Sequence, residues 1–248
     1  MASLSGKVAL VTGGSRGIGA ATAQRLAADG ATVAISYNSS PDRANEVVSA
    51  IEAAGGTAAA FQANAASADA SGTLVAQVVA RFGGLDILVN NAGVYRTGPI
   101  AEFSDADFDQ SIDVNVRGVF ATTRAAAPHL RENGRVINIG SVVAFVGFPG
   151  ASIYSATKAG VSAITASAAK EFGQKGITVN TVHPGPIDTE MNPGDPDVNP
   201  AAGMMASITA LGRYGTAEEI ASVVAFLASP EASYVTGAQI AVDGGMTA

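Results

Sequence analysis

The sequence predicts a doubly wound α/β fold, in which a parallel sheet lies between two layers of helices. Apolar runs alternate with amphipathic stretches along all 248 residues. Residues 8–11 and 87–89 are apolar at every position, which is typical of strands covered on both faces. Strand–helix alternation gives parallel strands joined by right-handed crossovers. Because no linker interrupts the alternation, we expect one three-layer domain over residues 1–248.

The expected strands are residues 7–12, 32–37, 57–62, 86–90, 135–139, 177–182 and 238–242. The expected helices are residues 18–29, 42–54, 69–82, 105–131, 153–172 and 217–228. Residues 184–212 break this rhythm, because five prolines there exclude a regular helix or a central strand. Long insertions in compact domains are often functional, so we expect a substrate lid at 184–212. A plain surface loop is the alternative.

Composition excludes several classes of protein. The net charge of −7 argues against binding to nucleic acid, which needs clustered cations. The absence of Cys excludes disulfides and thiolate metal sites, and two His are too few for a histidine-rich site, so we expect no metal. Residues 1–7 carry no long apolar region and no later stretch has membrane-spanning length. We therefore expect a cytoplasmic protein with no membrane partner.

A glycine-rich turn follows the first expected strand. Its spacing, Gly-x-x-x-Gly-x-Gly at residues 13–19, differs from the commonest dinucleotide fingerprint. Glycines allow backbone N–H groups to approach a pyrophosphate, which then lies at a helix N-terminus. The alternative is an ordinary strand–helix turn. The candidate cofactor-binding residues here are Gly13, Ser15, Arg16, Gly17, Ile18 and Gly19.

The end of the second expected strand bears on the choice of cofactor. NAD-binding domains usually carry Asp or Glu there to bind the ribose hydroxyls. This chain has Tyr37, Asn38 and Ser39 instead. An acidic group would repel a 2′-phosphate, whereas Arg16 and neutral donors can bind one. The pattern favours NADP (NADPH) over NAD, although Arg16 can also be read as a solvated turn residue.

Tyr154 and Lys158 lie four residues apart on an expected helix, so their side chains share one face. A tyrosine with its ordinary pKa near 10 is a poor base at neutral pH. A nearby ammonium favours the phenolate, so we expect Lys158 to lower the pKa of Tyr154. By itself this spacing is common, and an unremarkable amphipathic helix explains it equally well.

Further polar motifs follow other strands in order. Asn90-Asn91-Ala92-Gly93 follows the fourth strand, Ser141 follows the fifth, and Pro184-Gly185 follows the sixth. Asn115 lies in the helical region between the fourth and fifth strands. In open α/β sheets, ligands bind beyond the carboxyl ends of the strands, where most of these residues are expected.

Together these motifs resemble the short-chain dehydrogenase/reductase family along nearly the whole chain, including its 3-oxoacyl-carrier-protein reductase-like and carbonyl reductase members. The resemblance implies a Rossmann-like fold, a nicotinamide cofactor and a homo-oligomer, often a homotetramer but also a dimer. It implies that Tyr154 is the general acid/base, that Ser141 orients the substrate carbonyl and that Lys158 binds the nicotinamide ribose. It implies that Asn115 holds a water linked to Lys158. Further cofactor contacts are expected from Asn64, Asn91, Ala92, Gly93, Pro184, Gly185, Ile187 and Thr189.

Two positions need separate interpretation. Family members often carry Asp near the end of the third strand to contact adenine, whereas this chain has Asn64, which offers both an acceptor and a donor. His183 precedes Pro184 but has no recognisable carboxylate partner nearby in sequence, so we interpret it as structural.

The resulting hypothesis is an NADPH-dependent oxidoreductase that reversibly reduces a ketone or aldehyde, with a 3-oxoacyl thioester as one candidate. One alternative is an NAD-dependent alcohol or sugar dehydrogenase. Another is a nucleotide-binding or ligand-sequestering protein on the same fold, although a pure binder has no need of both Tyr154 and Lys158.

Overall fold

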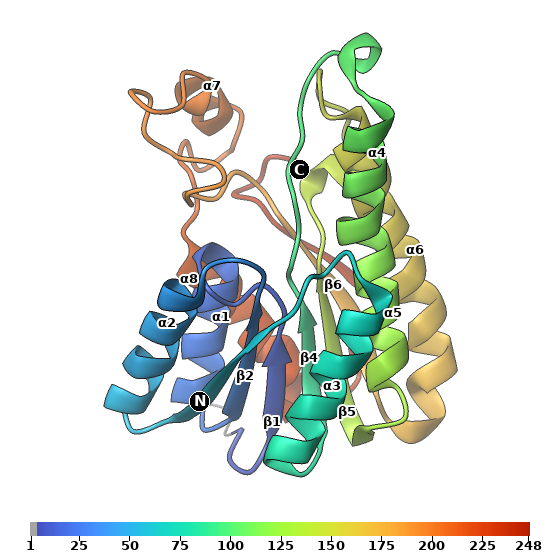
Figure 1. The fold of residues 1–248 in the computed structure, drawn as a ribbon. Coiled ribbons are helices and arrows are strands. Elements are labelled where there is room, and N and C mark those ends of the chain that lie inside the picture. Colours follow the sequence, from blue (N-terminus) through green and yellow to red (C-terminus); the bar gives the residue numbers. More distant parts are fainter. Residues whose placement is uncertain (1–3) are drawn as a thin grey trace.

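The computed structural model describes residues 4–248 as one parallel sheet covered by helices on both faces (Figure 1). The sheet has seven strands in the order β3-β2-β1-β4-β5-β6-β7, and each paired neighbour is parallel. The strands are β1 (Val8–Val11), β2 (Thr32–Tyr37), β3 (Thr57–Gln62), β4 (Leu85–Asn90), β5 (Leu130–Ile139), β6 (Thr178–Pro184) and β7 (Gln239–Val242).

The helices form the two outer layers. One layer contains α1 (Gly17–Ala28), α2 (Pro41–Ala53) and α8 (Ala217–Ala228). The other contains α3 (Ala68–Phe82), α5 (Gly118–Ala126) and α6 (Ser152–Phe172). Short 3-10 turns occur at Ile100–Glu102, Val142–Ala144, Gly173–Lys175 and Pro230–Ala232. The doubly wound, three-layer Rossmann-like fold is confirmed.

The central strands separate two hydrophobic cores. Along β2, Val33 and Ile35 pack with the α1 layer, whereas Ala34 between them packs with the α3 layer. Along β4, Ile87 packs with the α1 layer and Leu88 packs with the α3 layer. Successive strand side chains point to opposite faces, and both faces are covered here. This is why residues 33–35 of β2 and 87–89 of β4 are apolar at every position.

The single helix expected at residues 105–131 is wrong. The chain instead forms α4 (Asp105–Ile112), a π-helical turn (Asp113–Arg117) and α5, and β5 already begins at Leu130. Gly118 lies where the π turn ends, and a Cβ there would be 2.4 Å from the carbonyl oxygen of Ala65. Pro128 cannot donate a helical hydrogen bond, which fits the end of α5 at Ala126.

The proline-rich segment 184–212 also differs in detail from its prediction. Pro184 is the last residue of β6, and a short helix, α7 (Ala202–Ser207), follows the last proline of the segment. Regular structure is therefore present within this segment, after Pro200. Helices α4 and α7 both stand beyond the carboxyl ends of the strands (Figure 1). Among the helices in residues 4–248, none is long and apolar enough to span a bilayer.

Candidate active site

A cavity of about 1060 Å³ opens at the carboxyl edge of the sheet. Its walls come from the glycine turn, the ends of β2, β4 and β5, the start of α6 and the 184–212 segment. Every sequence-predicted site residue except Asn115 lines it, so the fold gathers groups that are far apart along the chain. These residues are Gly13, Ser15, Arg16, Gly17, Ile18, Gly19, Tyr37, Asn38, Ser39, Asn64, Asn91, Ala92, Gly93, Ser141, Tyr154, Lys158, Pro184, Gly185, Ile187 and Thr189.

The glycine turn fits a phosphate group. Gly17 has φ +52°, a left-handed conformation that favours glycine, and α1 begins there without a side-chain cap. A Cβ on Gly19 would lie 2.3 Å from the carbonyl oxygen of Gly13, so only glycine lets α1 pack this closely. Uncapped N–H groups at a helix N-terminus attract anions, and a pyrophosphate suits them.

Ser141 and Tyr154 meet inside the cavity. The Ser141 side chain faces the Tyr154 hydroxyl closely enough to favour its phenolate, although the two residues belong to different elements. The edge of the Tyr95 ring packs on Tyr154, with 4.8 Å between ring centroids at an angle of 75°. Sequence reasoning missed Tyr95, because an aromatic residue in an irregular segment carries no pattern that identifies its partner.

Lys158 lies beside this pair but points elsewhere. Its Nζ is 5.5 Å from the Tyr154 ring centroid and donates a hydrogen bond to the Ile139 carbonyl oxygen at 2.8 Å. Burial lowers the pKa of Lys158 to about 8, because the ammonium loses hydration.

The expected lowering of the Tyr154 pKa is wrong for this arrangement. Burial, together with Tyr95, raises the pKa of Tyr154 above its ordinary value, and the nearby Ser141 side chain opposes this only in part. The physical reason is that a phenolate here would be dry, while the Lys158 ammonium is directed at Ile139 rather than at the phenol oxygen.

Comparisons with known proteins give the family. A family model described as enoyl-(acyl carrier protein) reductase matches residues 13–247. The 3-oxoacyl-[acyl-carrier-protein] reductase FabG of Staphylococcus aureus is 45% identical over 242 residues, which are 97% of this chain and 98% of that protein. The chain belongs to the short-chain dehydrogenase/reductase family. The expected class, an NAD(P)-dependent dehydrogenase/reductase, is thereby confirmed.

Solved structures of this family superpose closely on the chain. A short-chain dehydrogenase/reductase from Serratia marcescens BCRC 10948 has a TM-score of 0.96 and 49% identity, covering 99% of both chains. A short-chain dehydrogenase from Burkholderia cenocepacia J2315, determined in complex with NADP, has a TM-score of 0.96 and 48% identity, again over 99% of both chains.

In this short-chain dehydrogenase/reductase, Asn115 is buried beneath the cavity. Its Oδ1 accepts from the Val94 N–H at 2.8 Å, and its Nδ2 donates to the Val94 carbonyl at 2.9 Å and to Thr157 Oγ1 at 3.2 Å. A Cβ on Gly93 would lie 3.3 Å from Asn115 Oδ1 and 3.7 Å from Lys158 Nζ, so both groups converge on Gly93. Asn115 therefore connects the segment that follows β4 to α6. Its water-mediated link to Lys158 remains a prediction.

His183 lies directly behind Ser141 and is fully buried. Its Nδ1 is 3.1 Å from the Ser141 nitrogen and 2.8 Å from the Ser141 oxygen, and its Nε2 is 3.3 Å from Ser162 Oγ. The Phe145 ring packs against it, with centroids 4.4 Å apart. Burial lowers the pKa of His183, which favours the neutral ring. These contacts fit a structural role for His183, directed at the backbone that carries Ser141.

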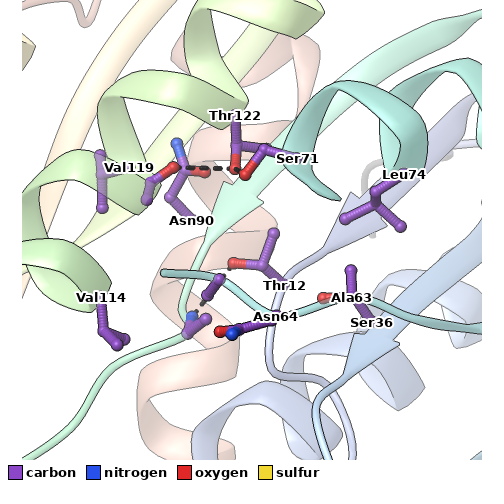
Figure 2. A pocket seen from close by; sticks show the side chains of 13 residues that line it. Thr12, Ser36, Ala63, Asn64, Ser71, Leu74, Asn90, Val114, Val119 and Thr122 are labelled. Carbon is purple, nitrogen blue, oxygen red and sulfur yellow. Dashed lines mark hydrogen bonds between the residues drawn. The ribbon is translucent and has the colours of Figure 1, made fainter. Parts of the chain in front are cut away.

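A second, much smaller cavity adjoins the main one, and Figure 2 shows the residues that line it. It measures about 10 Å³, enough for no more than one water, and Thr12, Ser36 and Asn90 contribute polar groups to its wall. Asn64 lines both cavities. Its Oδ1 accepts from the Ala66 N–H at 3.0 Å, and within residues 4–248 no partner takes its NH₂ group. Asn64 therefore presents a hydrogen-bond donor to the main cavity.

No group of three or more His, Cys, Asp or Glu in the described part of the chain could hold a metal ion. Of the apolar residues between Ser141 and Tyr154, the main cavity is lined by Val142, Val143, Phe148, Pro149 and Ala151.

Proposed function

We propose that this chain is an NADPH-dependent oxidoreductase that reduces a ketone or aldehyde reversibly, with a 3-oxoacyl thioester as its substrate class. The observation that carries the proposal is that Ser141, Tyr154 and Lys158 line the same cavity as the glycine turn. The Staphylococcus aureus relative is a 3-oxoacyl-[acyl-carrier-protein] reductase, and the Burkholderia cenocepacia structure holds NADP. Both names fit this reading.

The cavity offers groups for each part of a nicotinamide dinucleotide. The uncapped start of α1 suits the pyrophosphate, and Arg16, Asn38 and Ser39 suit a 2′-phosphate. The remaining residues proposed to hold the cofactor are Gly13, Ser15, Gly17, Ile18, Gly19, Tyr37, Asn64, Asn91, Ala92, Gly93, Tyr154, Lys158, Pro184, Gly185, Ile187 and Thr189. When bound, the cofactor supplies or accepts the hydride.

The chain itself supplies position and the proton. As a carbonyl carbon is reduced, negative charge develops on its oxygen, and the hydroxyls of Ser141 and Tyr154 can donate to it. The raised pKa of Tyr154 keeps its proton in place until that charge forms, which suits a general acid. In the reverse direction the same oxygen receives the proton of an alcohol. Lys158, through its bond to the Ile139 carbonyl, and Asn115, through its bond to Thr157, fix the start of α6 relative to the rest of the site.

Three large apolar side chains of the 184–212 segment line the cavity. Met191, Val198 and Met204 line it and are 49%, 66% and 60% exposed. Apolar side chains that face an open cavity suit an acyl chain, which would cover them. We assign this segment the role of a substrate lid, which would close over the acyl chain.

The test is a side-by-side activity screen of ketones, aldehydes, sugars, alcohols and 3-oxoacyl thioesters with NADPH and NADH. We expect the highest kcat/KM for a 3-oxoacyl thioester with NADPH. Preferred oxidation of an alcohol or sugar with NAD would instead establish the NAD-dependent dehydrogenase. Tight nucleotide binding without turnover of any compound would establish a ligand-sequestering protein.

A homo-oligomer, either a tetramer or a dimer, is also proposed. Phe108 and Phe120, on α4 and α5, are about half exposed, and Phe226 on α8 is 43% exposed. Apolar side chains at such positions are typical of symmetric interfaces between copies. Sedimentation velocity on the wild type and on Phe120→Glu tests this, and a monomeric wild type would refute it. We place the enzyme in the cytoplasm, where other reactions regenerate its cofactor.

A further inference from the structure

A single carboxylate joins two arginines at one end of the cavity. Glu190 pairs with Arg16 through Oε2 at 3.5 Å and with Arg43 through Oε1. Arg16 belongs to the glycine turn, Arg43 to the first turn of α2, and Glu190 to the 184–212 segment. The three residues are brought together only by the fold, because 147 and 174 residues separate the partners along the chain.

The position of this cluster identifies the part of the cofactor that it faces. Arg16 and Glu190 line the cavity together with Tyr37, Asn38 and Ser39, at the carboxyl end of β2. In dinucleotide-binding domains, this strand end lies beside the adenosine ribose, whose 2′ position is free in NAD and phosphorylated in NADP. A carboxylate at this place is therefore the group that a 2′-phosphate would meet.

We propose that Glu190 is an internal competitor of the 2′-phosphate, and that Arg16 and Arg43 together form the phosphate site that it occupies. This inference rests on the proposed NADPH dependence. With Glu190 in place, the cluster carries a net charge of +1. A phosphate dianion added beside Glu190 would make it −1, whereas a phosphate that displaces Glu190 would leave it neutral. Binding of NADP therefore requires Glu190 to leave the arginines.

The exposure of the three side chains makes such an exchange feasible. Arg16, Arg43 and Glu190 are 56%, 46% and 53% exposed, so water screens both ion pairs. Exposed ion pairs are weak, whereas a phosphate accepts several charge-assisted hydrogen bonds from paired guanidinium groups. The phosphate dianion therefore displaces Glu190 from the two arginines. This displacement reduces the net free energy of NADP binding.

Glu190 also connects this site to the segment proposed as a lid. Its neighbour Thr189 lies against the glycine turn, with Cγ2 3.4 Å from where a Cβ on Gly17 would be, and Met191 lines the cavity. NAD lacks the group that displaces Glu190, so the 190 region stays anchored to Arg16 and Arg43. Glu190 is thus a specificity-determining residue that lowers the preference for NADP over NAD.

The test is calorimetric titration with two probes that lack nicotinamide, adenosine 2′,5′-bisphosphate and 5′-AMP. Glu190→Gln should tighten the bisphosphate about fivefold and leave 5′-AMP within twofold, since two weak ion pairs no longer compete. Arg43→Gln should weaken the bisphosphate about tenfold and leave 5′-AMP unchanged. Glu46→Gln, an exposed position on α2, is the control for a general change in charge.

The outcomes separate this inference from the proposed function. Equal effects of Glu190→Gln and Glu46→Gln, or weaker bisphosphate binding in Glu190→Gln, would overturn the competitor role while NADPH dependence stands. Unchanged bisphosphate binding in Arg43→Gln would overturn the two-arginine site. Wild-type protein that binds neither probe would overturn the nicotinamide function, and this inference with it.

Discussion

Lys158 Nζ donates a 2.8 Å hydrogen bond to the carbonyl oxygen of Ile139, and both residues are buried. The bond joins the middle of the site on α6 to the last residue of β5. It also places a cation where hydration is lost, and a single carbonyl replaces little of that hydration. Burial of the Lys158 ammonium therefore lowers the stability of the fold, and the position of this lysine is explained by a role in the site.

Replacement of this cation should stabilise the cofactor-free protein and remove activity. Between pH 8 and 10.5, the pKa of Lys158 in the fold and its ordinary value, the folded state binds fewer protons than the unfolded state. The wild type should therefore gain stability relative to Lys158→Met as pH rises through this window. We expect Lys158→Met to be more stable by about 1 kcal/mol at pH 7, after the lost hydrogen bond is counted. Urea denaturation at pH 7, 8.5 and 10 measures this, and a difference independent of pH would contradict it.

Removal of the Tyr154 hydroxyl should abolish proton transfer and leave the fold intact. Tyr154→Phe should lower kcat for carbonyl reduction by about 10³-fold, within the range for loss of a general acid. Nucleotide affinity should stay within about threefold, because the ring remains. Tyr95→Phe is the matched control, since the two rings touch and only one hydroxyl is assigned to chemistry. Equal losses of activity in both variants would show that the Tyr154 assignment is wrong.

His183 is expected to act on Ser141 through the backbone. His183→Leu removes the polar contacts to Ser141 and Ser162, and should lower kcat about tenfold and stability by about 1–3 kcal/mol. KM for the nucleotide should not change. His183→Asn, which can restore one polar contact to the Ser141 backbone, should recover part of kcat. Loss of stability with full kcat in the Leu variant would limit His183 to the fold alone.

Gly19 is expected to control how closely α1 approaches the turn. In Gly19→Ala the new Cβ would lie 2.3 Å from the Gly13 oxygen and 2.5 Å from Asn91 Nδ2, so the helix start must move. Nucleotide affinity should fall at least about tenfold, because the donors at the start of α1 shift. Gly72→Ala in α3 is the control, since a Cβ there meets no atom within 4 Å. It should stabilise the protein by about 0.5–1 kcal/mol, and calorimetry measures both variants.

Asp86 should be important for stability but not for chemistry. At 3% exposure it accepts hydrogen bonds from Lys7 Nζ at 3.2 Å, the Val8 N–H at 2.9 Å and Arg131 Nη1 at 2.9 Å. Asp86→Ala should cost about 2–4 kcal/mol, because three donors lose their acceptor. The residue lies at the amino end of β4, away from the cavity, so kcat at 25 °C should not change. Urea denaturation and steady-state kinetics check the two parts, and a lower kcat in the folded variant would contradict the second.

Local patterns were sufficient for most of the fold. Strands β2 and β3 and helix α8 have the bounds that the sequence predicts, because burial on both faces and amphipathic periodicity are local signals. The failure at residues 105–131 has a physical cause. Apolar periodicity continues through the π turn and past Pro128, whereas the close approach of Gly118 to Ala65 depends on a distant segment.

The sequence by itself determined the family and predicted most of the polar residues that line the cavity, because ordered motifs at strand ends must meet at one edge of a parallel sheet. Only the tertiary structure decided how those residues act on one another. The direction of the Lys158 bond, the raised pKa of Tyr154 and the contact of His183 with Ser141 depend on burial and on atoms that are distant in sequence. The Glu190 bridge between Arg16 and Arg43 is of the same kind, since charges attract through space and not along the chain.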